Sequence, residues 1–203
     1  MPSTPAPSRV RAADELKHVA LEQFAAVGFG ATSLQTIADH AGYSKSSVLY
    51  HFASKEALLD AAVEPAVVEF ERLVDEFVVA GDQARRRLLV DQVVDLLLAH
   101  REAVHVFLIQ GQSLGELPII VRANTAVRRL AAAICHDRAS VTEQVRFGVG
   151  LGGAAFLLTA GRAFDDPGST TSDDELRDAL REVLAELLDP ISMSIVDRPA
   201  DQN

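Results

Sequence analysis

The sequence predicts an all-α protein of about nine helices, and three observations support that prediction. Apolar side chains recur at intervals of three and four residues in nearly every segment, which is the spacing of one helix face. No alternating run of apolar and polar residues is long enough to indicate a β-strand. Glycine, proline and hydroxyl residues divide the chain into pieces of helical length.

The first two helices are predicted before residue 43. The apolar stripe of residues 10–27 is followed by Gly28 and Gly30, which are typical of the end of a helix. Thr32 then offers a hydroxyl that could cap the start of a second, two-turn helix, and Gly42 ends that helix.

Two serines predict the starts of the third and fourth helices. Ser44 precedes a short helix, and Ser54 precedes a long one that covers about residues 55–77. Pro65 removes a backbone donor from the long helix and predicts a kink in its first third.

Helical spacing continues through the rest of the chain. The five further helices are expected at about residues 84–99, 101–111, 118–135, 142–163 and 173–189. The segment 142–163 is rich in glycine and apolar on nearly all sides, whereas 173–189 has a single apolar stripe that includes Val183.

Composition excludes several classes of protein. With 48% hydrophobic and 24% charged residues in 203, the chain has the balance of a globular protein. Its N-terminus, MPSTPAPSRV, lacks the apolar core of a signal peptide, and no apolar run reaches the roughly 20 residues that a membrane span needs. We therefore expect a cytoplasmic protein. One cysteine, Cys135, allows neither an internal disulfide nor a cysteine-based zinc site.

Charge is distributed unevenly along the chain. The formal net charge is −10, yet residues 1–56 contain five basic and five acidic side chains, so the whole negative excess lies in residues 57–203. This asymmetry indicates that the two segments have different partners.

The second and third helices match the pattern of a helix-turn-helix over about residues 33–52. Ala38 is small enough for close helix contact, Gly42 can form a left-handed turn, and Val48 can pack against the preceding helix. We expect Val48, Leu49 and Phe52 to point inward. The residues left on the outward side are Lys45, Ser46, Ser47, Tyr50 and His51. Such hydroxyl, ammonium, phenol and imidazole groups suit a helix that enters the major groove of DNA.

Residues 10–65 resemble the TetR family of bacterial transcriptional regulators. The resemblance depends on the combination of LEQFAAVGFGATS, IADHAGYSK, YHF and SKEALL. It implies a DNA-binding domain over residues 9–56, after a disordered arm at 1–8, and a ligand-binding and dimerisation domain over 57–203.

The resemblance also implies contacts with double-stranded DNA. Backbone phosphates would be contacted by Thr32 or Ser33, Tyr50, His51 and Lys55, and the positive end of the helix dipole near Ser44 would favour the same groups. Base edges would be contacted by Lys45, Ser46 and Ser47, with Tyr50 as a further candidate. Many members have tyrosine where this chain has Leu49, so that phosphate contact is either absent or made by Tyr50 instead.

For the second segment, the resemblance implies a small-molecule pocket within helices five to seven and a homodimer interface through 142–163 and 173–189. Close approach of two glycine-rich helices across a two-fold axis would bury the first of these; the alternative is that both helices belong to the internal core. Pocket candidates are polar residues that interrupt apolar runs, with two aromatic residues as walls. They are His100, His105, Gln110, Gln112, Asn124 and Thr159, with Phe107 and Phe156 as walls.

Each polar candidate could instead be an ordinary surface side chain. His100 and His105 are five residues apart, which does not match a helical metal pair, so we expect neither a metal nor a cofactor. Cys135 could in principle act as a redox switch, but a lone cysteine is most often a small buried apolar residue.

These features together predict a ligand-responsive homodimeric repressor, released from a palindromic operator by an unknown small molecule that moves the fourth helix near Pro65. One alternative is a helical ligand-binding protein whose DNA-binding helices do not function. The other is a helical-bundle enzyme, for which the sequence contains no catalytic triad order, P-loop, dinucleotide fingerprint or metal-ligand pair.

Overall fold

The computed structural model describes residues 7–80, 83–135, 140–159 and 172–188, and they form nine helices without a strand. The all-α prediction is therefore confirmed for these residues. The helices are α1 (Pro7–Val27), α2 (Leu34–Ala41), α3 (Lys45–His51), α4 (Lys55–Ala80), α5 (Gln83–Ala99), α6 (Arg101–Gln110), α7 (Pro118–Cys135), α8 (Val141–Thr159) and α9 (Asp173–Leu188).

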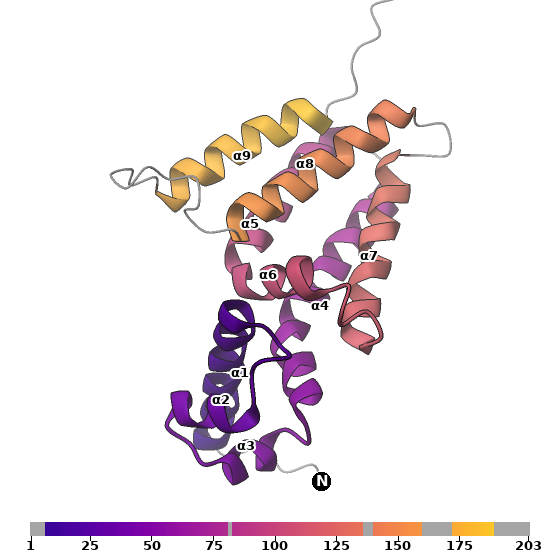
Figure 1. Cartoon of the computed structure of the whole chain (residues 1–203). Helices are drawn as coiled ribbons and strands as arrows, with labels where there is room; N and C mark the ends of the chain where they lie inside the picture. Colours follow the sequence, from indigo (N-terminus) through magenta and orange to yellow (C-terminus); the bar gives the residue numbers. More distant parts are fainter. Residues whose placement is uncertain (1–6, 81–82, 136–139, 160–171, 189–203) are drawn as a thin grey trace, which may run out of the picture.

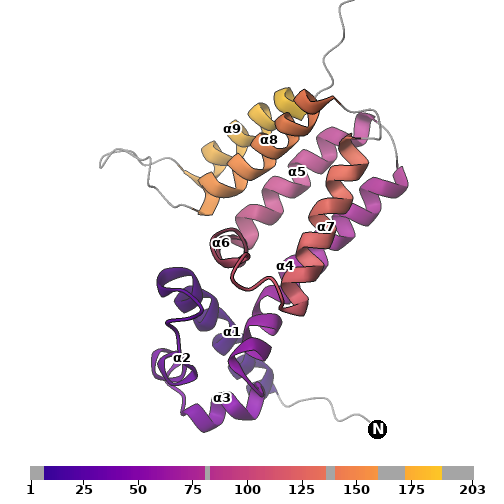
Figure 2. The ribbon, with the colours of Figure 1, turned by 45° about the vertical axis from the view of Figure 1, so that its right-hand side comes forward.

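The helices form a small group at one end of the molecule and a larger bundle at the other (Figure 1). Helices α1 to α3 lie beside the first part of α4, and α4 continues from them into the bundle of α5, α7, α8 and α9. Helix α6 lies between the group and the bundle in both views (Figures 1 and 2). Helices α4 and α6 therefore connect the bundle with the N-terminal helices.

Two clusters of buried apolar side chains correspond to this arrangement. The first combines α1, α2 and α3 with the first half of α4, with α6 and with the start of α7. Leu58 and Val63 of α4 and Val106 of α6 belong to it, so this core continues well beyond residue 56. The second cluster fills the bundle of α4, α5, α7, α8 and α9. The DNA-binding segment thus shares its core with α6.

Most of the predicted helix starts are confirmed. Ser44 caps α3, the Ser54 hydroxyl accepts a hydrogen bond from the Ala57 amide at the start of α4, and Pro118 begins α7. The prediction that Thr32 caps α2 is wrong, because Ser33 is the N-cap and accepts from the Thr36 amide.

Helix α9 is fixed on α5 by both packing and charge. Leu180 and Leu184 are buried against the bundle, and Arg181 lies 3.1 Å from Asp91 of α5. Burial of apolar surface dominates, because a partly exposed ion pair typically stabilises by only about 0–1 kcal/mol. Most of the apolar stripe of α9 is therefore used inside its own chain, whereas Val183 is exposed.

Candidate nucleic-acid interface

The turn between α2 and α3 fixes the direction of α3. Gly42 has a φ of 73°, a left-handed conformation that glycine adopts without strain, and Ala38 and Val48 are fully buried on either side of it. A Cβ at Gly42 would meet no atom within 4 Å, so the requirement for glycine comes from the backbone and not from packing. The predicted contact of two small helices through Ala38 and Val48 is confirmed.

Helix α3 presents one polar face to solvent. Lys45 and Ser46 are exposed, Tyr50 is 64% exposed, and Ser47 and His51 are half-buried. Ser44 is exposed and its hydroxyl accepts from the Ser47 amide, which fixes the first turn of α3. The structure therefore brings these predicted DNA-contacting residues together on one surface.

Leu49 departs from the prediction that it points inward, since it is 46% exposed. Adjacent residues of a helix differ by about 100° in direction. Because Val48 occupies the inward direction of this two-turn helix, Leu49 points away from the core. Leu49 therefore presents apolar groups beside Lys45 and Tyr50. Apolar groups of this kind contact the C5-methyl group of thymine in the major groove.

Arg9 joins this surface, and the sequence did not single it out. Its guanidinium carbon lies 4.7 Å from the centroid of the Tyr50 ring, a cation–π distance. The His51 ring meets the Tyr50 ring edge-on at 5.3 Å. Tyr50 is thus positioned from two sides, and Arg9 adds a positive charge beside it. The one available signal in the sequence was a basic residue at the start of the first helix.

Tyr43 ties the α2–α3 turn to α1. Its hydroxyl donates a hydrogen bond of 2.6 Å to Glu15 Oε2, 28 residues away. That bond to the Glu15 carboxylate raises the pKa of Tyr43, because ionisation would remove the donated proton. The turn is therefore held against α1 at neutral pH.

Lys55 has a structural role that its sequence position did not reveal. Its Nζ donates to Phe29 O at 2.7 Å and to Thr32 O at 2.8 Å, and it lies 4.2 Å from the centroid of the Phe29 ring. A lysine ammonium has three donors, so two of them hold the turn between α1 and α2. One donor is left for the predicted phosphate contact.

The two candidates at the start of α2 differ in access. Thr32 is only 2% exposed and its hydroxyl donates to Gly28 O at 2.8 Å, so its side chain is not available to a duplex. This corrects the inclusion of Thr32 among the DNA-contacting side chains. Ser33 is exposed at the N-terminus of α2, where backbone N–H groups favour a phosphate.

A separate cavity of about 280 Å³ lies within the helical bundle. Its walls come from α4, α5, α6, α7 and α8. Among the described residues, every side chain that lines it is apolar, and two glycines of α8, Gly148 and Gly152, complete the wall. Phe107 is the one predicted pocket residue among them.

The other pocket candidates lie elsewhere. Gln110 bonds to backbone groups of Phe24 and Phe29, and His100 Nε2 lies 2.9 Å from Glu69 Oε2. His105, Gln112, Asn124 and Phe156 are not among the residues that line the cavity, and the side chain of Thr159 lies outside the described residues. Among these polar candidates, Gln110 and His100 thus contact other parts of the chain, and Gln112 is exposed. In the sequence, the residues that line the cavity follow the same pattern as ordinary core residues. The spacing of Gly148 and Gly152, four residues apart, was a signal that could have indicated this wall of the cavity.

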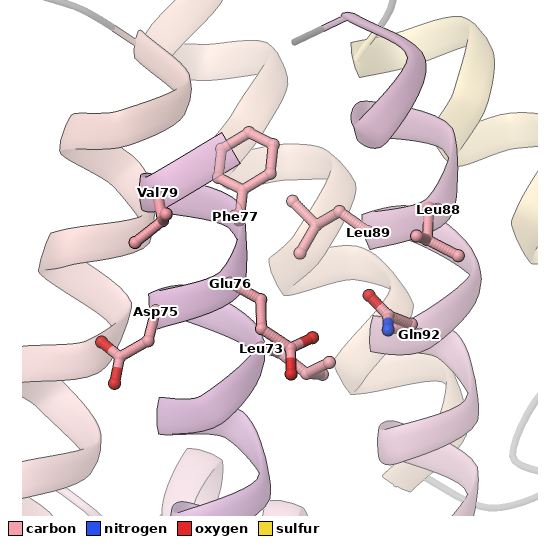
Figure 3. A pocket seen from close by; sticks show the side chains of 8 residues that line it. All are labelled: Leu73, Asp75, Glu76, Phe77, Val79, Leu88, Leu89 and Gln92. Atoms are coloured by element: carbon pink, nitrogen blue, oxygen red, sulfur yellow. The ribbon is translucent and has the colours of Figure 1, made fainter. Parts of the chain in front are cut away.

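A second hollow of about 460 Å³ lies between the end of α4 and the start of α5 (Figure 3). Its wall includes Asp75 and Glu76, and these carboxylates bond to Arg129 and Arg72 at 2.6 Å. This hollow lies at the end of α4 remote from α1 to α3 and has no wall from α6. We therefore take the five-helix cavity as the candidate ligand site.

The part of the chain that the structure describes contains neither a candidate metal site nor a candidate membrane span. Its residues hold no group of three or more His, Cys, Asp or Glu side chains that could bind a metal ion. None of its helices combines the length and the apolar character that crossing a membrane requires.

The outward-facing α3 and the buried contacts beneath it define a helix-turn-helix DNA-binding protein. Residues 17–62 match the model of the family described as bacterial regulatory proteins, tetR family. Residues 17–62 therefore form a DNA-binding domain of that family, and the chain is a DNA-binding transcriptional regulator.

Solved structures support the same fold over most of the chain. A member of the TetR transcriptional regulator family from Streptomyces coelicolor A3 is 26% identical, with a TM-score of 0.66 over 86% of this chain and 89% of the other. A TetR-family regulator from Bordetella parapertussis 12822 is 21% identical, with a TM-score of 0.66 over 88% and 95%. The ketosteroid transcriptional regulator KstR2 of Mycobacterium tuberculosis is 18% identical, with a TM-score of 0.65 over 91% and 95%. No curated protein matches the sequence.

Proposed function

We propose that this protein is a homodimeric repressor in the cytoplasm that leaves its operator when an uncharged, apolar small molecule enters the five-helix cavity. The observation that best supports this proposal is that one chain contains both an outward-facing α3 and an apolar cavity. Helix α6 belongs both to the wall of this cavity and to the core of the N-terminal helices. Regulators of this family are generally not enzymes, and we propose a binding role for the cavity.

At the operator, Lys45, Ser46 and Ser47 would meet base edges, and Leu49 would contact a thymine methyl group. Phosphates would be bound by the groups around this surface. These are Arg9, Ser33, the N-terminus of α3 at Ser44, Tyr50, His51 and the remaining donor of Lys55. Phosphate contacts would fix the orientation of α3, and base contacts would select the sequence.

The dimer would form through an apolar stripe on α8. Val141, Val145 and Val149 recur every four residues, so they lie on one face of the helix, and they are 74%, 55% and 61% exposed. Such a run of exposed apolar groups indicates a binding surface. Burial against a second copy would account for it and would also cover Val183 of α9, which is 51% exposed. Two α3 helices about 34–36 Å apart would then meet successive major grooves.

The lining of the cavity determines the class of ligand. An ionised group placed there would lose its hydration without gaining a partner from any described side chain, which costs several kcal/mol. Since a water molecule takes roughly 30 Å³ in the liquid, 280 Å³ suits a molecule of about ten non-hydrogen atoms. We therefore infer a neutral hydrocarbon-like ligand or ligand portion.

Naphthalene and naphthalene-2-carboxylate test this assignment, because they share a ring system of about the right size and differ in charge. We expect naphthalene to bind and raise the Tm, and the carboxylate to bind at least about 100-fold more weakly. Gly152→Leu should abolish naphthalene binding, since a Cβ at Gly152 meets nothing within 4 Å and the side chain would occupy the cavity.

Ala132→Leu, at an exposed position of α7 outside the cavity, is the matched control and should leave naphthalene binding unchanged. Calorimetric titration measures both ligands with all three proteins. Equal affinity for the two ligands would contradict the proposed ligand class. Unchanged naphthalene affinity in Gly152→Leu would contradict the assigned site.

A further inference from the structure

We propose that Gln110 is the positioning residue through which occupancy of the cavity is transmitted to the DNA-binding helices. Its side-chain amide holds the turn between α1 and α2 by two hydrogen bonds from α6. This inference rests on the proposed ligand response and adds to it the physical link between the two sites.

The side-chain amide of Gln110 acts both as a hydrogen-bond donor and as an acceptor at the end of α1. Its Nε2 donates to Phe24 O at 2.7 Å, and its Oε1 accepts from the Phe29 N–H at 2.5 Å. The two partners lie on opposite sides of Gly28, whose φ of 92° reverses the chain. A Cβ at Gly28 would approach Gln110 Oε1 to 3.7 Å, so the amide lies directly against the turn. No other standard side chain of this length offers a donor and an acceptor without charge.

The turn held by Gln110 determines where α2 begins. It leads from α1 to Ser33, the N-cap of α2, and Lys55 holds its other side through Phe29 O and Thr32 O. Phe29 therefore accepts a hydrogen bond from α4 through its carbonyl and donates one to α6 through its amide. A displacement of α6 relative to α4 would pull on this single peptide segment from one side. Since α3 is packed on α2, its orientation would change with it.

The same helix reaches the cavity. Phe107, one turn before Gln110 on α6, lines the cavity together with Val104 and Leu108. A helix rises about 1.5 Å per residue, so Phe107 and Gln110 are about 4.5 Å apart along the axis. A ligand that displaces Phe107 would therefore move Gln110 as part of one rigid helical turn. Figure 2 shows α6 between the bundle and the N-terminal helices.

A double-mutant cycle tests this link without knowledge of the natural ligand. Gly152→Leu serves as a permanent occupant of the cavity, and Gln110→Met keeps the side-chain length while removing both hydrogen bonds. The affinity for a duplex selected by the native protein from a random library is measured for the native chain, both single variants and the double variant. Coupling between sites is commonly about 5- to 150-fold.

We expect Gly152→Leu to weaken duplex binding at least about fivefold in the native background and less than about twofold in the Gln110→Met background. Gln112→Met, at an exposed position two residues further on, is the control and should preserve the full response. Gln110→Met should bind naphthalene at least as tightly as the native protein, because Gln110 does not line the cavity and its two hydrogen bonds no longer oppose the movement of α6. Naphthalene should also accelerate hydrogen exchange of the Phe29 amide in the native protein.

The possible failures separate the link from the function on which it rests. An equal effect of Gly152→Leu in both backgrounds would overturn the role of Gln110 and leave the ligand response intact. No effect of either Gly152→Leu or naphthalene on duplex affinity in the native background would overturn the ligand response, and the link with it. If Gln110→Met does not fold, Gln110→Glu takes its place in the cycle. Glutamate keeps the acceptor for the Phe29 N–H and loses the donor to Phe24 O. A smaller effect of Gly152→Leu on duplex affinity in this background supports the role of Gln110, and an undiminished effect overturns it.

Discussion

Lys55→Met is expected to lower the Tm by roughly 4–8 °C and to weaken operator binding severely, although Lys55 is a partly exposed lysine beside the DNA-binding surface. Hydrogen bonds from a charged donor contribute about 1.5–3 kcal/mol each. Because Lys55 is only half-buried, we take about 2 kcal/mol for its two bonds to Phe29 O and Thr32 O together. Loss of these bonds frees the turn that begins α2, so the change affects both stability and DNA binding.

Lys45→Met is the matched control for that experiment. Lys45 is exposed on α3, and no hydrogen bond or ion pair from its side chain is described within the chain. Its loss should leave the Tm unchanged, weaken operator binding by about 1–3 kcal/mol and relax the preference for the base that Lys45 contacts. Thermal unfolding and binding to the operator and to base-substituted operators separate the two lysines. A Tm of Lys55→Met equal to that of the native protein would show that the bonds from Lys55 do not hold the turn.

Val149→Asp is expected to convert the dimer into a monomer and to reduce operator affinity by at least about 100-fold. Val149 is 61% exposed at the last position of the α8 stripe and near the middle of α8, and a carboxylate there would be buried without a partner in a two-fold interface. A monomer binds each half-site separately and loses the gain of about 10²–10⁴ that comes from linking two binding events.

Val79→Asp makes the same substitution at an even more exposed position, 88%, near the end of α4. It should preserve both the dimer and operator binding, because Val79 lies outside the α8 stripe. Sedimentation velocity measures the size of both variants. A Val149→Asp protein that sediments as a dimer would place the interface on another surface.

The sequence predicted the helices well because their determinants are local. The hydroxyls of Ser44 and Ser54 and the ring of Pro118 act within one turn of their own positions, and their helices begin where the sequence indicated. Ala38 and Val48 were recognisable for the same reason, since their spacing around Gly42 is typical of a helix-turn-helix.

The functional contacts were harder to predict because they depend on tertiary structure. Gln110 bonds to Phe24, 86 residues away, and Lys55 bonds to a carbonyl 26 residues away, so neither partner could be inferred from local spacing. Leu49 was misplaced because a two-turn helix has too few residues to define a face by periodicity. Polar residues were predicted to line the ligand pocket, whereas the residues that line the cavity are apolar and follow the same sequence pattern as a packed core.

Selection of duplexes from a random library by the purified protein tests the outward presentation of α3 most directly. We predict enrichment of an inverted repeat with half-site centres about 10 base pairs apart, since two α3 helices would occupy grooves one helical turn apart. The Lys45→Ala/Tyr50→Ala protein should enrich no sequence while keeping the native Tm. Equal enrichment of the same repeat by the double variant, or no enriched sequence with the native protein, would contradict the role assigned to α3.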